Sequence, residues 1–257
     1  DSYFISEFYK KFDQFCVKNN VIAEFLRFHP LLENHKLASN SMEIIKNRET
    51  ISLDIRKDIN TIWMEEYNPK NRNKIRKAQK NNFKVKIDSD INLFYNIYKS
   101  TMQRIDADSF YFFSFEYFKL IKKELKNNSS YLFVYDEEKK CYCAMILFTY
   151  KNYSHYHLSG RNPEFNNNCV NNFILDEAVK ISQKFNAKTF HFGGGMSNDQ
   201  NDTLFKFKSN FSKDKNDFYI GKRIHNKNIY NKIIDQWRNK FKSHEKYDHL
   251  LLKYYYY

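Results

Sequence analysis

Apolar residues recur every three or four positions in several stretches of the chain, a spacing typical of amphipathic helices. The first such stretch spans residues 3–19 and carries Phe4, Phe8, Phe12, Phe15 and Cys16. A second spans residues 170–185, with Val170, Phe173, Ile174, Ala178, Ile181 and Phe185 on one face. Further helices are predicted at about 58–67, 70–81, 90–103, 114–126 and 229–241, the first of them capped by Asp58.

Strict alternation of apolar and polar residues predicts strands elsewhere. The predicted strands cover about 21–28, 44–55, 83–87, 131–135, 141–150, 154–159, 189–192, 205–211 and 217–220. Polar turns at 136–140 and 151–152 join three of them into an antiparallel meander. The order of helices, meander, helix and two further strands predicts an α+β fold with a mixed, mostly antiparallel sheet flanked by helices. A change of pattern near residue 88 predicts a boundary between 1–87 and 88–257.

The composition of the 257 residues narrows the class of protein. No apolar run approaches the roughly 18 residues that a membrane helix needs, and the N-terminus lacks the pattern of a signal peptide. The chain has no initiator Met, so we expect a fragment whose first segment is missing. The spacing of Cys141 and Cys143 is too tight for a zinc knuckle, and no second pair follows. We therefore expect buried thiols in a reducing cytoplasm and no metal site.

The net charge is +13, from 43 Lys and Arg against 30 Asp and Glu. Such an excess favours polyanionic partners such as RNA, nucleotide diphosphates or anionic lipid surfaces, although an AT-rich genome also enriches Lys, Asn and Ile. The densest cationic run, residues 70–80, includes Arg72, Arg76 and Lys77. A charge run of this kind is either a solvated helix face or a contact surface for RNA or nucleotide-linked phosphates.

Four local sequences resemble motifs of the FemABX (Fem-like) peptidyltransferases, a branch of the GNAT-like acyltransferases. Residues 72–78 resemble a basic R-x-x-I-R-K-A helix, and residues 101–104 with Tyr111 resemble a segment that holds the acceptor. Residues 155–160 resemble a Y-x-L-x-G strand, and residues 192–194 followed by 204–211 resemble f-G-G…l-x-x-F-K-x-x-F. Together the four motifs span residues 70–225, and residues 21–31 resemble the tail of a first, degenerate GNAT half.

The resemblance implies a GNAT-like acyltransferase domain at 88–257, preceded at 1–87 by part of a degenerate GNAT half and a basic connecting helix. It also implies an activated acyl donor as co-substrate, either aminoacyl-tRNA or acyl-CoA, with no bound cofactor. One departure matters. Ordinary GNAT enzymes cradle the CoA pyrophosphate on a glycine-rich loop at a helix N-terminus, whereas residues 160–168 here contain one glycine and Pro163. This departure favours aminoacyl-tRNA as the donor.

Acyl transfer to an amine requires a positioned amine, removal of its proton and stabilisation of an oxyanion. By position in the F-K motif, Lys208 is the implied cation near the reacting ester, with Lys206 as the alternative if the register differs. His155 and His157 are expected on one face of a strand, with Tyr156 and Leu158 on the other, and either histidine is a candidate base or a structural residue.

Further candidates would bind substrate. Arg104 and Tyr111 are expected to hold the acceptor's phosphate or carboxylate. The alternative is a structural role: a surface salt bridge for Arg104 and core packing for Tyr111. Arg27 and His29 end a predicted strand, where functional loops often follow. Gly193, Gly194 and Gly195 are three of only five glycines in the chain, so their clustering predicts a backbone that lines the transfer cleft or a plain strand-end turn.

The predicted function is therefore transfer of an activated acyl or aminoacyl group to an amine of a bacterial cell-envelope precursor. The acceptor would be a peptidoglycan peptide or an amino sugar, handled in the cytoplasm or in peripheral contact with a membrane. Charged tRNA is the expected partner. Two alternatives stay open at this point: an acyl-CoA-dependent N-acyltransferase of envelope sugar biosynthesis, and a non-catalytic RNA-binding module that uses the basic helix.

Overall fold

The computed structural model describes residues 2–165, 167–199, 201–242 and 244–255. Its backbone contacts divide the chain into two compact units, residues 1–49 with 216–257 and residues 50–215. The boundary expected near residue 88 concerns the division into GNAT-like halves and stays a prediction. Within the described ranges, no helix is long and apolar enough to cross a membrane.

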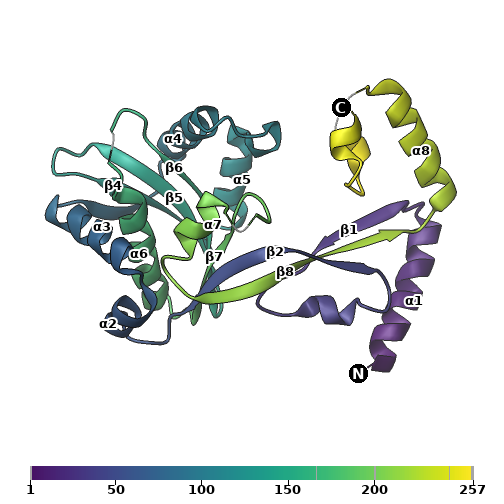
Figure 1. The fold of residues 1–257 in the computed structure, drawn as a ribbon, viewed down its shortest axis with the longest axis horizontal. Coiled ribbons are helices and arrows are strands. Elements are labelled where there is room, and N and C mark those ends of the chain that lie inside the picture. Colours follow the sequence, from purple (N-terminus) through teal and green to yellow (C-terminus); the bar gives the residue numbers. More distant parts are fainter. Residues whose placement is uncertain (1, 166, 200, 243, 256–257) are drawn as a thin grey trace. The chain divides into compact units, whose positions relative to one another are not determined.

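The helices and strands follow the predicted order along most of the chain (Figure 1). The α-helices are α1 (Ser2–Lys18), α2 (Ile59–Thr61), α3 (Pro69–Lys80), α4 (Ile91–Arg104), α5 (Phe115–Glu124), α6 (Val170–Lys184), α7 (Thr203–Lys208) and α8 (Lys227–Lys240). A π-helical turn, Ile62–Glu66, continues α2, and short 3-10 helices cover Asn34–Leu37, Ser109–Tyr111, His244–Tyr247 and Lys253–Tyr255. The strands are β1 (Ala23–Arg27), β2 (Glu43–Asp54), β3 (Lys84–Asp88), β4 (Ser129–Tyr135), β5 (Cys141–Tyr150), β6 (Tyr153–Arg161), β7 (Thr189–Gly194) and β8 (Asp214–Ile224).

The strands form one sheet in the order β1-β8-β2-β7-β6-β5-β4-β3. The pairs β1–β8, β2–β7, β3–β4, β4–β5 and β5–β6 are antiparallel, and β6–β7 is parallel. The expected α+β class with a mixed, mostly antiparallel sheet is confirmed. The parallel pair needs a crossover connection, which α6 supplies between β6 and β7.

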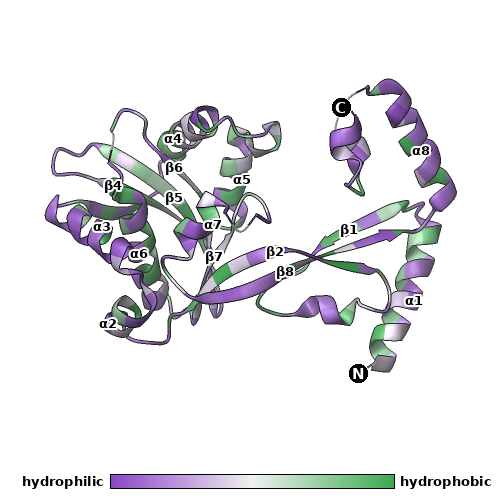
Figure 2. Cartoon of the chain, in the orientation of Figure 1, coloured by the Kyte–Doolittle hydropathy of each residue, from purple (hydrophilic) through white to green (hydrophobic). Residues whose placement is uncertain are grey.

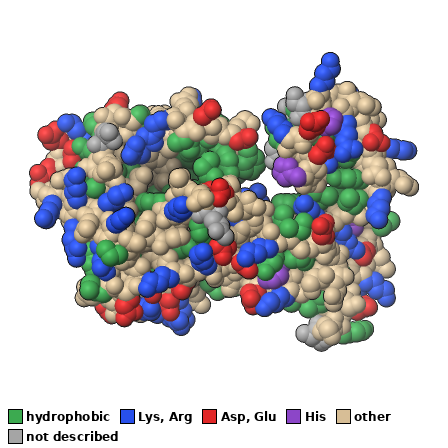
Figure 3. All heavy atoms as spheres, in the orientation of Figure 1, with side chains coloured by type: hydrophobic (Ala, Val, Ile, Leu, Met, Phe, Trp, Pro, Cys, Tyr) green, Lys and Arg blue, Asp and Glu red, His purple; other side chains and the backbone are tan. Residues whose placement is uncertain are grey.

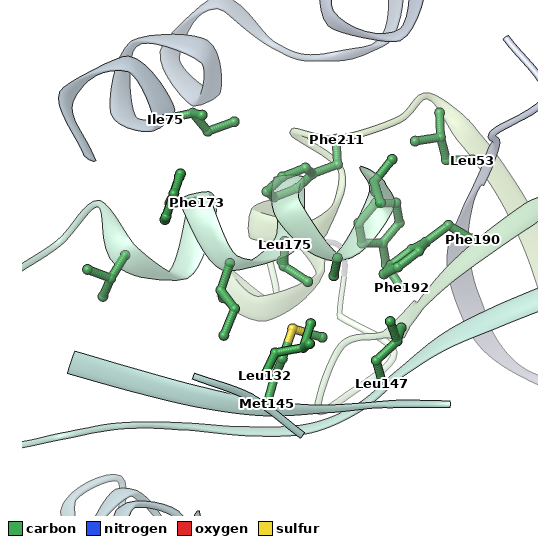
Figure 4. Packing of buried hydrophobic residues seen from close by; sticks show 14 of the residues in the cluster. Leu53, Ile75, Leu132, Met145, Leu147, Phe173, Leu175, Phe190, Phe192 and Phe211 are labelled. Atoms are coloured by element: carbon green, nitrogen blue, oxygen red, sulfur yellow. The ribbon is translucent and has the colours of Figure 1, made fainter. Parts of the chain in front are cut away.

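Alternating side chains of β4 and β5 build two cores, one on each face of the sheet. Leu132, Met145 and Leu147 pack with α6, and α3 covers α6 from outside (Figure 4). The intervening residues of the same strands, such as Phe133 and Ile146, pack instead with α4 and α5. Both faces of the central strands are therefore buried, which accounts for the long apolar runs in their sequence.

The first unit has a smaller apolar core, in which Phe28, Ala38 and Met42 pack with Ile44 and Tyr219. Helix α1 buries Cys16, but much of its aromatic stripe is exposed, including Phe4, Phe8 and Phe15. Cys16 and the other three cysteines are buried free thiols, as the sequence predicted.

One predicted strand is wrong. Residues 203–208 form helix α7, not part of a strand over 205–211. The side chain of Asp202 caps this helix by accepting a hydrogen bond from the backbone N–H of Phe205. The alternation of Phe205 and Phe207 with lysines fits a strand, but a helix of six residues is too short to display a clear helical period. Lys208 therefore projects from a helix.

A second correction concerns β6. Its register against β5 pairs Tyr156 with Leu147 and Leu158 with Ile146, so His157 is the extra residue of a β-bulge. Because a bulge reverses the alternation beyond it, Tyr156 packs with the core on the α6 side and Leu158 with the core on the α4 side. The expectation that Tyr156 and Leu158 share one face is wrong for this reason.

Candidate active site

The two parallel strands β6 and β7 pair over only three residues each. Their register runs from Tyr153 opposite Thr189 to His155 opposite His191, and the bulge at His157 follows directly on β6. Beyond this point a cavity of about 240 Å³ lies beside the middle of β6 and the end of β7. Its walls come from α4, the segment after α4, β6, the β7 end and α7: Tyr98, Met102, Ile105, Ala107, Tyr111, Tyr156, His157, Leu158, Ser159, Gly194, Gly195, Met196, Leu204 and Lys208.

The Lys208 side chain lies in the wall of this cavity, although the residue is only 7 % exposed. Its Nζ donates a hydrogen bond of 2.7 Å to the backbone oxygen of Gly194 and lies 5.2 Å from the centre of the Tyr156 ring. The aromatic face and the carbonyl together stabilise a positive charge at this place. Lys206, on the same helix, is exposed and donates to Asn201 instead.

The three glycines form the end of β7 and the loop that follows it. Gly193 adopts a φ of 79°, which favours glycine, and a Cβ there would lie 3.3 Å from the Lys208 Nζ. A Cβ on Gly195 would approach the Asp202 carboxylate to 2.5 Å. Asp202 accepts hydrogen bonds from the backbone N–H groups of Met196 and Ser197 as well as capping α7. This carboxylate therefore joins the glycine loop to the helix that carries Lys208.

His157 lies in the cavity wall between aromatic neighbours. Its ring stacks on Phe148 with 4.4 Å between centroids, and its Nε2 is 2.8 Å from the Tyr117 hydroxyl oxygen. Burial lowers the pKa of His157 to about 4. The imidazole is thus neutral near pH 7, with one ring nitrogen hydrogen-bonded to Tyr117.

His155 is paired with a histidine that the sequence did not single out as a site residue. The Nδ1 atoms of His155 and His191 are 3.0 Å apart, and their rings stack with 5.0 Å between centroids. His191 lies opposite His155 in the parallel pair of β6 and β7. The sequence does not show which strands pair, so it could not identify His191 as a partner of His155. The ring of His155 also lies close to Gly193, at 3.8 Å from a Cβ built there.

The two candidates for acceptor binding differ in position. Tyr111 lines the cavity, and its backbone oxygen accepts a hydrogen bond of 2.6 Å from the Tyr98 hydroxyl. Arg104 is exposed at the end of α4 and is not among the lining residues, although its neighbour Ile105 is. Burial, and then the charge of Arg161, lowers the pKa of Arg104. A role for Arg104 in binding the acceptor stays a prediction.

Arg27 and His29 belong to the other compact unit. Arg27 is exposed at the end of β1, and the His29 Nδ1 accepts a hydrogen bond of 3.2 Å from the backbone N–H of Leu31. This unit also contains a larger cavity, of about 750 Å³, near the ion pair of Asp13 and Arg223. That cavity contains none of the candidate residues, so its size alone does not make it the active site.

The basic helix α3 presents its cations to solvent. Arg76 and Lys77 are exposed, and the Arg76 guanidinium lies over the Trp63 ring at 5.3 Å. Arg72 has a structural contact, because its Nη1 donates to the backbone oxygens of Trp63 and Met64. Figure 2 shows α3 as almost entirely hydrophilic, and in Figure 3 Lys and Arg side chains gather over the region where it lies. The helix contains no acidic residue.

The segment between β6 and α6 uses several of its backbone N–H groups internally. The N–H of Asn162 donates to the Tyr142 oxygen, that of Glu164 to the Asn162 side chain, and that of Cys169 to the Asn167 side chain. A pyrophosphate cradle needs such groups directed at the ligand. In the described part of the chain, no group of three or more His, Cys, Asp or Glu side chains could hold a metal ion.

Known structures share this fold at low sequence identity. FemX superposes with a TM-score of 0.72 and 13% identity, covering 91% of this chain and 79% of its own. L-PGS from Bacillus licheniformis gives a TM-score of 0.60 at 12% identity, covering 83% and 71%. The C-terminal domain of a putative lysylphosphatidylglycerol synthetase from Agrobacterium fabrum gives 0.55 at 13% identity, covering 78% and 67%. No family model matches the chain, and no curated protein does.

These likenesses establish the class of fold: the chain has the GNAT-like fold of FemX, and the resemblance inferred from four short motifs is confirmed at that level. At identities of 12–13% they establish the fold alone. Function must therefore be argued from the cavity and its residues.

Proposed function

We propose that this chain transfers an activated acyl or aminoacyl group to an amine of a cell-envelope precursor, and that the 240 Å³ cavity is the site of transfer. The observation that carries the proposal is the position of Lys208. A cationic side chain, nearly buried and held by the Gly194 carbonyl, lies in the wall of a cavity in a fold shared with FemX.

The chemistry follows from this placement. When an amine attacks the carbonyl carbon of an ester or thioester, negative charge develops on the carbonyl oxygen and then on the leaving oxygen or sulfur. An ammonium in a partly enclosed cavity stabilises that charge more than the same group would in water. Lys208 supplies this charge. The His155–His191 pair, beside Gly193, is the candidate acceptor of the amine's proton, because the low pKa of His157 makes that residue a weak base.

Aminoacyl-tRNA is the donor that the surroundings of the cavity favour. The N–H groups of Asn162, Glu164 and Cys169 already donate within the protein, which leaves them poorly suited to a CoA pyrophosphate. By contrast, the exposed cations of α3 suit a long polyanion. We propose that Arg76 and Lys77 contact the phosphate backbone of the tRNA, while Arg72 mainly holds the helix in place.

The test is a transfer assay on the purified chain with two donor classes. Total tRNA charged with labelled amino acids and labelled acetyl-CoA would each be incubated with a peptidoglycan precursor peptide and with an amino sugar nucleotide. We expect label to move from tRNA to one amine acceptor. Transfer from acetyl-CoA alone would assign the chain to the acyl-CoA-dependent class. tRNA binding without transfer to any acceptor would support a non-catalytic RNA-binding module.

A further inference from the structure

Helix α7 is too short to hold its own position. A helix of six residues is unstable by itself in water, so contacts with the rest of the protein must fix it in place. At its N-terminal end, the Asp202 carboxylate joins α7 to the loop after β7. At its C-terminal end, the contacts centre on Asn210, two residues beyond Lys208. The position of Lys208 therefore depends on both ends of the helix.

The side chain of Asn210 binds the last turn of α7. Its Nδ2 donates hydrogen bonds to the backbone oxygens of Lys206, at 3.0 Å, and Phe207, at 3.3 Å. These oxygens lie among the C-terminal carbonyls that a helix cannot satisfy from its own backbone. The next residue, Phe211, is fully buried and stacks on Phe192. Asn210 is thus connected to α7 on one side and to the hydrophobic core on the other.

The backbone oxygen of Asn210 connects this turn to the start of the basic helix α3. It accepts a hydrogen bond of 2.8 Å from the backbone N–H of Asn68 and another of 3.1 Å from the Nδ2 of Asn71. Asn71 is only 2 % exposed, and its Oδ1 accepts a hydrogen bond of 2.7 Å from the Asn172 side chain on α6. A buried polar network with its groups paired makes its surroundings rigid. The Asn71 side chain therefore holds the C-terminal end of α7 at a fixed place relative to α3 and α6.

We propose that Asn71 is a positioning residue for Lys208, and that it acts through Asn210 and the last turn of α7. This inference rests on the proposed function, because it takes the Lys208 ammonium to stabilise charge at the reacting ester. Asn71 is not among the residues that line the cavity, so its contribution is the accuracy with which the ammonium is placed. A displacement of about 1 Å at a catalytic group can lower a rate by about 100-fold. We expect a smaller loss here, because the bond between Asn68 and Asn210 remains.

The first measurement is the steady-state kinetics of Asn71→Ala, which should lower kcat by about tenfold and leave the KM for the donor almost unchanged. Asn128→Ala is the matched control. Asn128 is half-buried in the same compact unit, and its Nδ2 also donates to a backbone oxygen, that of Thr149, at 2.8 Å. Both variants should unfold at lower urea concentrations, but the control should keep kcat within about twofold of wild type. Equal losses of kcat would trace the effect to a general loosening of the fold and overturn the inference.

A double-mutant cycle tests whether Asn71 acts through Lys208. If it only places the ammonium, Asn71→Ala should change kcat by less than about twofold in a chain that already carries Lys208→Ala. Losses that multiply would show that Asn71 affects turnover by another route. That result would overturn the inference and leave the proposed function intact. An unchanged kcat in Lys208→Ala alone would contradict both.

Hydrogen exchange tests the contact between Asn71 and Asn210 without a transfer assay. In Asn71→Ala, the amides of residues 203–211 should exchange at least about tenfold faster, while those of β4 and β5 keep their rates. Unchanged exchange in residues 203–211 would overturn the inference whatever the reaction. If Asn71→Ala does not fold, Asn210→Ala replaces it in all three measurements, because it removes the bonds to the Lys206 and Phe207 oxygens from a half-buried position. The same results are then expected, and the same results would overturn the inference.

Discussion

Helices α3 and α7 both carry closely spaced cations, but their surroundings differ. On α3, Arg76 and Lys77 are exposed on a helix without acidic residues. On α7, Lys208 is nearly buried against the Gly194 carbonyl and the Tyr156 ring, in the wall of the cavity. Exposed charges act at long range, are screened by salt and are interchangeable, whereas an enclosed charge acts on one atom at one distance. Cations that look alike in the sequence therefore suit different tasks.

The largest effect is expected from Lys208. Lys208→Ala should lower kcat by about 100-fold or more, because it removes charge stabilisation that is strongest in the transition state. Lys206→Ala is the matched control, since Lys206 lies on the same short helix but is exposed. Steady-state kinetics with whichever acceptor the transfer assay identifies, together with thermal unfolding of both variants, would check this. Comparable losses of kcat in the two variants would contradict the proposal that Lys208 stabilises charge in the transition state.

A smaller effect, on binding, is expected from α3. The double reversal Arg76→Glu and Lys77→Glu should weaken tRNA affinity by about tenfold or more at low salt and reduce the log–log salt slope by roughly two. Arg72 is left unchanged because it donates to the Trp63 and Met64 oxygens.

Reversal of Lys119 and Lys123, which are exposed on α5, serves as the control for general loss of charge. The two double variants should differ in filter-binding titrations with charged tRNA. They should not differ in turnover of a minimal aminoacyl ester that lacks the RNA. Equal weakening by both would mean that tRNA responds to net charge and not to the α3 surface.

The smallest effect concerns the pH dependence of stability. Burial holds the pKa of His157 at about 4, below its ordinary value near 6.5, so the unfolded chain binds the proton more readily. The stability from this group is present above pH 6.5 and is lost as pH falls toward 4, by at most about 1.4 kcal/mol per pH unit. Urea unfolding across this range should show the loss, and His157→Gln should reduce it. A variant with the same pH profile as wild type would show that His157 is not the group responsible.

Long elements were predictable from the sequence because each repeats its period several times. Helix α6 and the meander β4–β6 lie close to the predicted residues, and the predicted cap at Asp58 is present. Short elements were not. The six residues of α7 alternate like a strand, and what makes them helical is the Asp202 cap and the packing of Phe205 and Phe207 against the core. Six residues are too few for the spacing of apolar residues to distinguish a helix from a strand.

Local patterns in the sequence were enough to predict the order of the elements, the α+β class, the cluster of glycines after β7 and the F-K motif that contains Lys208. They could not predict which residues meet around the cavity. The bulge at His157, the parallel pairing that places His191 beside His155, and the loop that Asp202 ties to α7 all join residues distant in the chain or break a local pattern. The physical reason is that alternation fixes the face on which a side chain lies within one element. The place where two strands stop pairing depends on what packs around them.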